Sequence, residues 1–117
     1  MFTVTFYETE DGKTPVEDWI ASLDFKMRAK VISMLELLEE KGNTLRKPYT
    51  EHIGDGIYEL RAIQGNDISR TLFFFYEGHR IIVTNGFIKK QRKTPPAEIK
   101  IAKERRKDFY RQAGKKV

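Results

Sequence analysis

Three strand-like runs follow one another in the second half of the chain, and they restrict its fold more than any other feature. The runs are Ile57–Ile63, Ile68–Tyr76 and Arg80–Ile88, and each is rich in β-branched and aromatic residues. Their connections, Gln64–Asp67 and the pair Glu77-Gly78, are short enough for β-hairpins. The sequence therefore predicts a three-stranded antiparallel meander.

Two helices are predicted ahead of the meander. Thr14 and Glu17 form a capping box, with a proline at the first helical position, that opens a short helix ending near Ala21. Asp24 is a good N-cap for a second helix over residues 25–41, in which apolar residues recur at helical spacing. The two segments are expected to form a helical hairpin.

The remaining segments complete an α+β domain. Thr3–Tyr7 alternates and is rich in β-formers, which predicts a short N-terminal strand. Residues 43–56 are polar and rich in turn formers, so we expect a long loop there. Thr94 is the predicted cap of a C-terminal helix over about residues 95–112. No repeat or linker divides the chain, so residues 1–117 are predicted to form one domain.

Composition and the start of the chain narrow the class of protein. Cysteine is absent, so disulfides and thiolate metal sites are excluded. The histidines His52 and His79 have no further metal ligands beside them, and we expect neither a metal nor a cofactor. The chain shows no signal peptide and no apolar run long enough to cross a bilayer, which predicts a cytoplasmic protein without a membrane partner.

Positive charge is concentrated at the C-terminal end of the chain. Residues 87–117 hold twelve Lys or Arg against three acidic residues, a local net charge of +9. Residues 1–86 hold ten against fourteen, a net charge of −4. A mildly acidic body with a strongly basic end suggests a polyanionic partner, and nucleic acid is the commonest one.

The first hairpin is expected to place two arginines side by side. If Ile63 pairs with Ile68 across the turn, Arg61 lies directly opposite Arg70. Like charges in this position repel, and a bound phosphate would relieve the repulsion because guanidinium groups grip phosphate oxygens in a bidentate manner. The alternative is that each arginine pairs with a carboxylate, since Glu59 lies on the same face.

The second hairpin extends this row of polar side chains. If Tyr76 pairs with His79 across the turn, Arg70 lies opposite Asn85. Alternation then adds Phe87 to the same face of the sheet.

A run of cations leaves the last predicted strand close to this row. Its lysines are Lys89, Lys90 and Lys93, and Arg92 lies between the last two. Crowded ammonium groups disfavour protonation of one another, so one of them can have a pKa low enough to act as a base. The alternative is a solvated positive stretch that discourages edge pairing.

Several short motifs carry a resemblance to a known family. They are residues 56–61 (GIYELR), 69–74 (SRTLFF), 87–90 (FIKK) and 93–95 (KTP), followed by Glu98-Ile99. Together they resemble the RelE/HigB superfamily of type II toxins, most closely its phage-derived HigB-like branch. The blocks occur in the family's order and spacing, and the predicted strand and helical hairpin that precede them match its layout, so the resemblance implies a RelE-like fold.

The resemblance implies a small endoribonuclease that enters the ribosomal decoding site and cleaves mRNA there without a metal. In this chemistry a base activates the ribose 2′-hydroxyl, cationic groups stabilise charge on the phosphate, and an acid protonates the leaving oxygen. It also implies a cognate antitoxin, a HigA-like helix-turn-helix protein, so that DNA is contacted only through the antitoxin.

On this resemblance, Arg61 and Arg70 hold the scissile phosphate and its developing charge. Charge, contacts to ribosomal RNA and proton transfer are assigned to Lys89, Lys90 and Lys93. His52, in the predicted loop, is a further candidate for acid or base. Additional RNA contacts are expected from Tyr58, Asn85, Phe87 and Arg92. Tyr110 lies too deep in the last helix to replace the tyrosine that some RelE relatives use, so the acid and base stay unassigned.

Alternative functions remain open from the sequence. One is a non-catalytic RNA- or ribosome-binding module that uses the basic helix, and another is a structural phage or accessory protein with a soluble cationic surface. Tyr58 and Phe87 can stack on bases if they are exposed, and they belong to the core if they are not.

Overall fold

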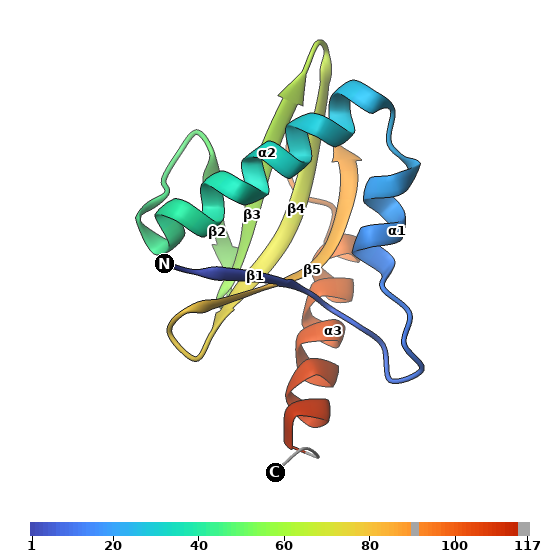
Figure 1. The fold of residues 1–117 in the computed structure, drawn as a ribbon, viewed down its shortest axis with the longest axis vertical. Helices are drawn as coiled ribbons and strands as arrows, with labels where there is room; N and C mark the ends of the chain where they lie inside the picture. Colours follow the sequence, from blue (N-terminus) through green and yellow to red (C-terminus); the bar gives the residue numbers. More distant parts are fainter. Residues whose placement is uncertain (90–91, 115–117) are drawn as a thin grey trace.

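The structure is a computed structural model that describes residues 1–89 and 92–114 (Figure 1). Over these residues the chain forms five strands, three α-helices and one short 3₁₀ helix, which confirms the α+β prediction. In chain order the elements are β1 (Thr3–Phe6), α1 (Pro15–Ser22), α2 (Phe25–Lys41), η1 (Gly42–Thr44), β2 (Thr50–Gly54), β3 (Ile57–Gln64), β4 (Asp67–Tyr76), β5 (Arg80–Lys89) and α3 (Pro96–Gly114).

The strands form one mixed sheet in the order β1-β5-β4-β3-β2. The predicted meander is its centre, because β3, β4 and β5 pair antiparallel with their chain neighbours. The N-terminal strand β1 joins the sheet beside β5 and runs parallel to it, with Thr3 opposite Arg80. A parallel neighbour needs a long crossover connection, and this one contains α1 and α2.

The predicted loop over residues 43–56 is wrong, because it contains η1 and the edge strand β2. That strand pairs antiparallel with β3, and a tight turn joins the two at Asp55, whose φ of 53° is left-handed. Its sequence, TEHIG, is mostly polar and ends in glycine, so no hydrophobic alternation marks it. Pairing with an already formed neighbour therefore decides that β2 is a strand.

Helices cover each face of the sheet (Figure 1). On one face, α1 and α2 pack against Leu60, Phe73 and Val83. On the other face, α3 packs against Leu72 and Phe74 through Ala102. The sheet thus separates one hydrophobic cluster from another, and residues that alternate along β3 and β4 belong to different clusters.

The two predicted helix caps have different outcomes. The Asp24 carboxylate accepts a 3.0 Å hydrogen bond from the Met27 amide, as predicted for an N-cap. The predicted capping box at Thr14 is wrong, because Thr14 makes no side-chain cap bond. Its ψ of 79° lies below the extended range that directs a capping hydroxyl toward the helix.

The first hairpin has the predicted register. Ile63 pairs with Ile68, and Arg61 therefore lies directly opposite Arg70. The turn sets this register. From the turn onward β3 and β4 pair through seven consecutive positions without a bulge, so the pairing at the turn fixes which residues lie opposite each other.

The predicted register of the second hairpin is wrong. Tyr76 pairs with Arg80 rather than His79, and a bulge between Leu72 and Phe73 shifts the pairing again. Arg70 consequently lies opposite Phe87, whereas Asn85 pairs with Leu72. Each shift moves β5 by one residue relative to β4, and one shift alone would turn its side chains to the opposite face. Because there are two, Asn85 and Phe87 stay on the same side of the sheet as Arg70.

A glycine on β5 accommodates the tryptophan of α1. A Cβ atom added at Gly86 would lie 2.3 Å from the Trp19 ring, well inside van der Waals contact. We therefore expect Gly86→Ala to lower the free energy of unfolding by about 1–3 kcal/mol through overpacking, measured by urea denaturation. Gly114→Ala is the matched control, because a Cβ there meets nothing within 4 Å. An unchanged midpoint for Gly86→Ala would show that the close approach is not a constraint.

Candidate anion-binding site

The arginine pair lies at the end of the sheet beneath the start of α3, and a buried carboxylate joins its members. Glu59 is 1% exposed, and its Oε2 forms ion pairs with Arg70 and, at 3.4 Å, with Arg61 Nη2. A second carboxylate, Glu51 of β2, accepts a 2.7 Å bond from Arg61 Nη2. We call these four residues, Glu51, Glu59, Arg61 and Arg70, the arginine cluster.

The arginine cluster reaches two further segments. Glu51 also pairs with Lys47, in the segment before β2, with Nζ and Oε1 3.0 Å apart. The Thr94 hydroxyl donates a 2.5 Å bond to Glu59 Oε1, so it does not cap α3 as predicted. Instead the Pro95 carbonyl accepts the first bond of the helix, from the Glu98 amide.

The arginines therefore have the carboxylate partners that the alternative interpretation of the sequence predicts. Glu59 relieves the cross-strand repulsion inside the protein, so a bound anion is not required for this purpose. The two side chains differ in access: that of Arg70 is 7% exposed, whereas that of Arg61 is 23% exposed. Arg70 Nε is buried and has no hydrogen-bond partner among the described residues.

Burial and neighbouring charges shift the acidity of the cluster. Burial lowers the pKa of Arg70, and the negative charge of Glu51 opposes this shift. Burial also lowers the pKa of Lys89 at the end of β5, and the charges of Arg70 and Arg61 lower it further. The hydrogen bond from Lys47 is the largest cause that lowers the pKa of Glu51. The sequence predicts a lysine with a lowered pKa, and the structure assigns the effect to burial and the strand arginines.

A cavity of about 320 Å³ opens beside the arginine cluster. Cations from two segments border it: Arg70 of β4 and the exposed Arg92 and Lys93 ahead of α3, with Thr94 next to them. Its carboxylates, Glu51 and Glu59, already pair with arginines. The size of the cavity falls in the range of small-ligand sites, and its surplus of positive charge suits an anion.

The remaining predicted site residues divide between the two faces. Lys90 lies outside the described residues. His52 pairs with Tyr58 across β2 and β3, and their ring centroids lie 4.7 Å apart. Because Glu51 and Glu59 face α3, alternation turns His52 and Tyr58 toward α2, away from the arginines. His52 thus borders the cavity from the edge strand, but its ring is not beside the arginine pair as predicted.

Asn85 and Phe87 lie under α3. Asn85 is 4% exposed, and its side-chain amide donates to the Glu98 carbonyl and carboxylate at 3.2 and 2.9 Å. Phe87 packs into the cluster beneath α3. The predicted RNA contact of Asn85 is therefore covered by the helix, because α3 packs over this face of the sheet.

The basic helix uses several of its arginines to hold itself to the body. Arg105 Nη1 donates a 2.8 Å bond to the carbonyl of Thr84, the extra residue of the β5 bulge. Arg106 pairs with Asp55 in the β2–β3 turn at 3.0 Å. Arg111 pairs with Glu10 at 3.1 Å. Two of these three arginines therefore neutralise acidic residues of the same chain, and the third holds a backbone carbonyl.

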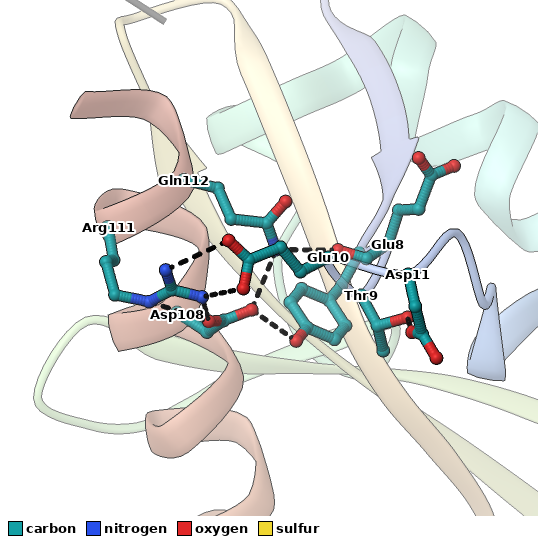
Figure 2. Close-up of polar contacts among 8 residues, drawn as sticks. Glu8, Thr9, Glu10, Asp11, Asp108, Arg111 and Gln112 are labelled. Atoms are coloured by element: carbon teal, nitrogen blue, oxygen red, sulfur yellow. Dashed lines mark hydrogen bonds and ion pairs between the residues drawn. The ribbon is translucent and has the colours of Figure 1, made fainter. Parts of the chain in front are cut away.

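The far end of α3 is held by a polar network (Figure 2). Asp108 accepts a 2.6 Å bond from the hydroxyl of the buried Tyr7, and it also pairs with Arg111. Gln112 donates to Asp108 at 2.7 Å and to the Glu8 carbonyl at 3.0 Å. Figure 2 shows Arg111 and Gln112 directed from α3 toward the segment after β1, so the network joins the two ends of the chain.

The network raises the pKa of Tyr7 and lowers the pKa of Asp108. Burial and the hydrogen bond to Asp108 raise the pKa of Tyr7 to about 12. Bonds from Tyr7, Arg111 and Gln112 lower the pKa of Asp108 to about 2. The stability from neutral Tyr7 is fully present below its ordinary pKa of 10.0 and is lost as pH rises through about 12. The stability from ionised Asp108 is present above its ordinary pKa of 3.8 and is lost as pH falls through about 2.

Removing the tyrosine hydroxyl tests this network. We expect Tyr7→Phe to lower the free energy of unfolding at pH 7 by about 1.5 kcal/mol, because Asp108 loses a charge-assisted hydrogen bond. Near-ultraviolet absorbance should show a tyrosine that ionises near pH 12 in the parent protein, and this step should be missing from the variant. A late ionisation that persists in Tyr7→Phe would contradict the assignment.

A double-mutant cycle tests the buried pair of the arginine cluster. Glu59→Met should cost about 3–5 kcal/mol of unfolding free energy, because it leaves Arg70 buried without its partner. Arg70→Met should cost less, because Glu59 keeps its contacts with Arg61 and Thr94. The double variant should lose clearly less than the two together, since it removes both charges. Glu36→Met, at an exposed position of α2, is the control for the substitution itself. Strict additivity in the cycle would show that Glu59 and Arg70 are not coupled.

The comparisons with known proteins place the chain in a family. It belongs to the phage-derived protein Gp49-like family (DUF891), whose model matches residues 18–107. The match runs from α1 into α3 and includes every residue of the arginine cluster and of the adjoining cavity. No curated protein matches the chain.

Membrane-spanning helices and metal clusters are both missing from the part of the chain that the structure describes. Within residues 1–89 and 92–114, no helix combines the length and apolar character needed to cross a membrane. Across the same residues, His, Asp and Glu side chains form no group of three or more that would hold a metal ion.

Proposed function

We propose that this protein is the toxin of a type II toxin–antitoxin system and acts as an endoribonuclease on mRNA in the translating ribosome. The Gp49-like family is commonly associated with toxins of this kind, which supports the first part. The cationic cavity beside the arginine cluster supports the second. As partner we propose a cognate helix-turn-helix antitoxin, through which DNA would be contacted.

The observation that carries the proposal is the surplus of positive charge around one small cavity. Arg70, Arg92 and Lys93 border it, and Arg61 and Lys89 lie close enough to influence the same groups. The two carboxylates of the arginine cluster do not balance these charges. A surplus of this kind attracts the phosphate of RNA and stabilises the charge that develops when its backbone is attacked.

The exposure of each cation suggests its role. Arg61 and Lys93 are accessible and would contact the scissile phosphate, with Arg61 leaving or sharing Glu51 when the phosphate binds. Arg70 is buried and paired, so it would act as a positioning residue that fixes Glu59 and maintains the positive potential. Glu59 in turn holds Thr94 and thereby the connection that carries Lys93.

Lys89 is the group of this site best suited to proton transfer. Burial and two arginines lower its pKa, so its ammonium group releases a proton more readily than an ordinary lysine. In a cleavage in which solvent water accepts the proton of the 2′-hydroxyl, the 2′-oxygen bonds to phosphorus to form a 2′,3′-cyclic phosphate and the bond from phosphorus to the 5′-oxygen breaks. Lys89 would donate a proton to that leaving 5′-oxygen and be reprotonated from solvent.

Primer extension on a translated mRNA after induction of the protein tests the proposal. The parent protein should produce cuts within codons that are absent when translation is blocked. Arg61→Ala and Lys89→Met should each reduce cutting by about a hundredfold, because each removes charge stabilisation or the proton donor. Lys100→Ala, at an exposed position of α3 outside the cavity, should cut as the parent does.

If the folded parent protein makes no translation-dependent cuts, the proposed nuclease activity is overturned. A non-catalytic RNA- or ribosome-binding module is the alternative, and the carboxylate partners of Arg61 and Arg70 favour it. Such a module would arrest translation without cuts, and Arg61→Ala would weaken RNA binding and reduce its salt dependence by about one phosphate contact.

A further inference from the structure

A second cavity lies across the edge strand β2 from the arginine cluster, on the face covered by α2. Its volume is about 450 Å³, and residues of the segment that joins α2 to β2 line it. Figure 1 shows the path of this segment beside the edge of the sheet. Glu51 and His52 border this cavity as well as the first one. The two cavities therefore adjoin around one edge of the sheet.

The floor of the second cavity is a set of aromatic rings. The Tyr58 ring lies between His52, with a centroid distance of 4.7 Å, and Phe73, which it stacks on at 5.6 Å and 19°. Phe75 meets Tyr58 edge-on at 5.3 Å. His52 is exposed and Tyr58 is half-buried, so this ring series is open to the cavity at its outer end.

The hydrogen bonding of His52 fixes how its ring can meet a ligand. Its Nε2 accepts a 3.2 Å bond from the Gly56 amide in the turn after β2. In the neutral ring the proton is therefore on Nδ1, which can donate to a ligand. The turn thus holds the imidazole against Tyr58 as an aromatic surface with one polar edge.

The rim of the cavity is cationic. Arg46 and Lys47 are both exposed, and Lys47 already pairs with Glu51. Arg46 makes no ion pair with any residue that the structure describes, so its guanidinium is available to a ligand. An exposed imidazole at the end of an aromatic series, beside an unpaired guanidinium, matches a nucleotide, which offers a planar base and a phosphate.

We propose that this second cavity binds one base of a single-stranded RNA, stacked on His52 at the outer end of the ring series, with Arg46 contacting the adjacent phosphate. The identity of the ligand as RNA rests on the proposed function. A strand that crosses the edge of the sheet at β2 would place one nucleotide in this cavity and a neighbouring phosphate at the arginine cluster. The cavity would then position the strand, while the arginine cluster contacts the linkage that is cut.

Binding of a short fluorescent RNA, followed by anisotropy over a range of salt concentrations, tests the proposal. His52→Ala should weaken binding about tenfold without changing the salt dependence, because a stacked base carries no charge. Arg46→Ala should weaken binding and reduce the slope of log affinity against log salt by about one phosphate contact. Lys30→Ala, which removes an exposed cation of α2 away from the cavity, should lose less than twofold in affinity.

A second set of measurements separates base stacking from hydrogen bonding and from peptide binding. Tyr58→Phe keeps the ring and should weaken RNA binding far less than Tyr58→Ala, which removes the ring that supports His52. An RNA with one abasic position should bind the parent more weakly, and His52→Ala should reduce that loss. Unchanged RNA affinity in both His52→Ala and Arg46→Ala, with folded protein confirmed by circular dichroism, would overturn the proposal. A proline-rich or aromatic peptide that binds here while RNA does not would also overturn it.

Failure of this inference can be distinguished from failure of the nuclease. If the parent cuts no mRNA but RNA binding still depends on His52 and Arg46, the proposed RNA-binding cavity is supported and the proposed nuclease activity is contradicted. If the parent cuts mRNA and both variants bind RNA normally, the proposed nuclease activity is supported and the proposed RNA-binding cavity is contradicted. A His52→Ala variant that binds normally but cuts poorly would instead assign His52 to proton transfer.

Discussion

The buried carboxylate of Glu59 holds together the end of the sheet where the candidate site lies. It pairs with arginines from β3 and β4 and accepts a hydrogen bond from Thr94, which precedes α3. Without it, two guanidinium groups would oppose each other in a region with little access to water, where an uncompensated charge is costly. The close approach of the two arginines and the position of Thr94 next to Lys93 depend on this one side chain.

The basic C-terminal end of the chain, which the sequence suggests is a nucleic-acid surface, also holds α3 to the acidic body. The acidic body and the basic helix pair with each other, through Asp55 with Arg106 and Glu10 with Arg111. These contacts fasten α3 over the sheet, which buries Asn85. The proposed RNA contacts therefore come from the cations around the cavity and on the rim near β2 rather than from the helix arginines. The proposed function depends on the cations that border the two cavities.

The edge strand β2 is where the two proposals meet. Alternation sends Glu51 to the arginine cluster and His52 to the aromatic floor, so one strand contributes to cavities on opposite faces. An edge strand has no neighbour on its outer side, which leaves room for an extended chain to pass around it. RNA binding across this edge would explain why aromatic and cationic side chains gather on both sides of a short, polar strand.

The meander and the shared face of Arg61 and Arg70 could be predicted from the sequence, because a short turn sets strand register and alternation then sets the face. The strand over residues 50–54 could not, since its polar sequence becomes ordered only by pairing with β3. The same pairing turned His52 away from the arginines, and the bulge beside Phe73 moved Asn85 out of the arginine row. Strand pairing and bulges depend on contacts between distant segments, and these contacts leave no periodic signal in the chain itself.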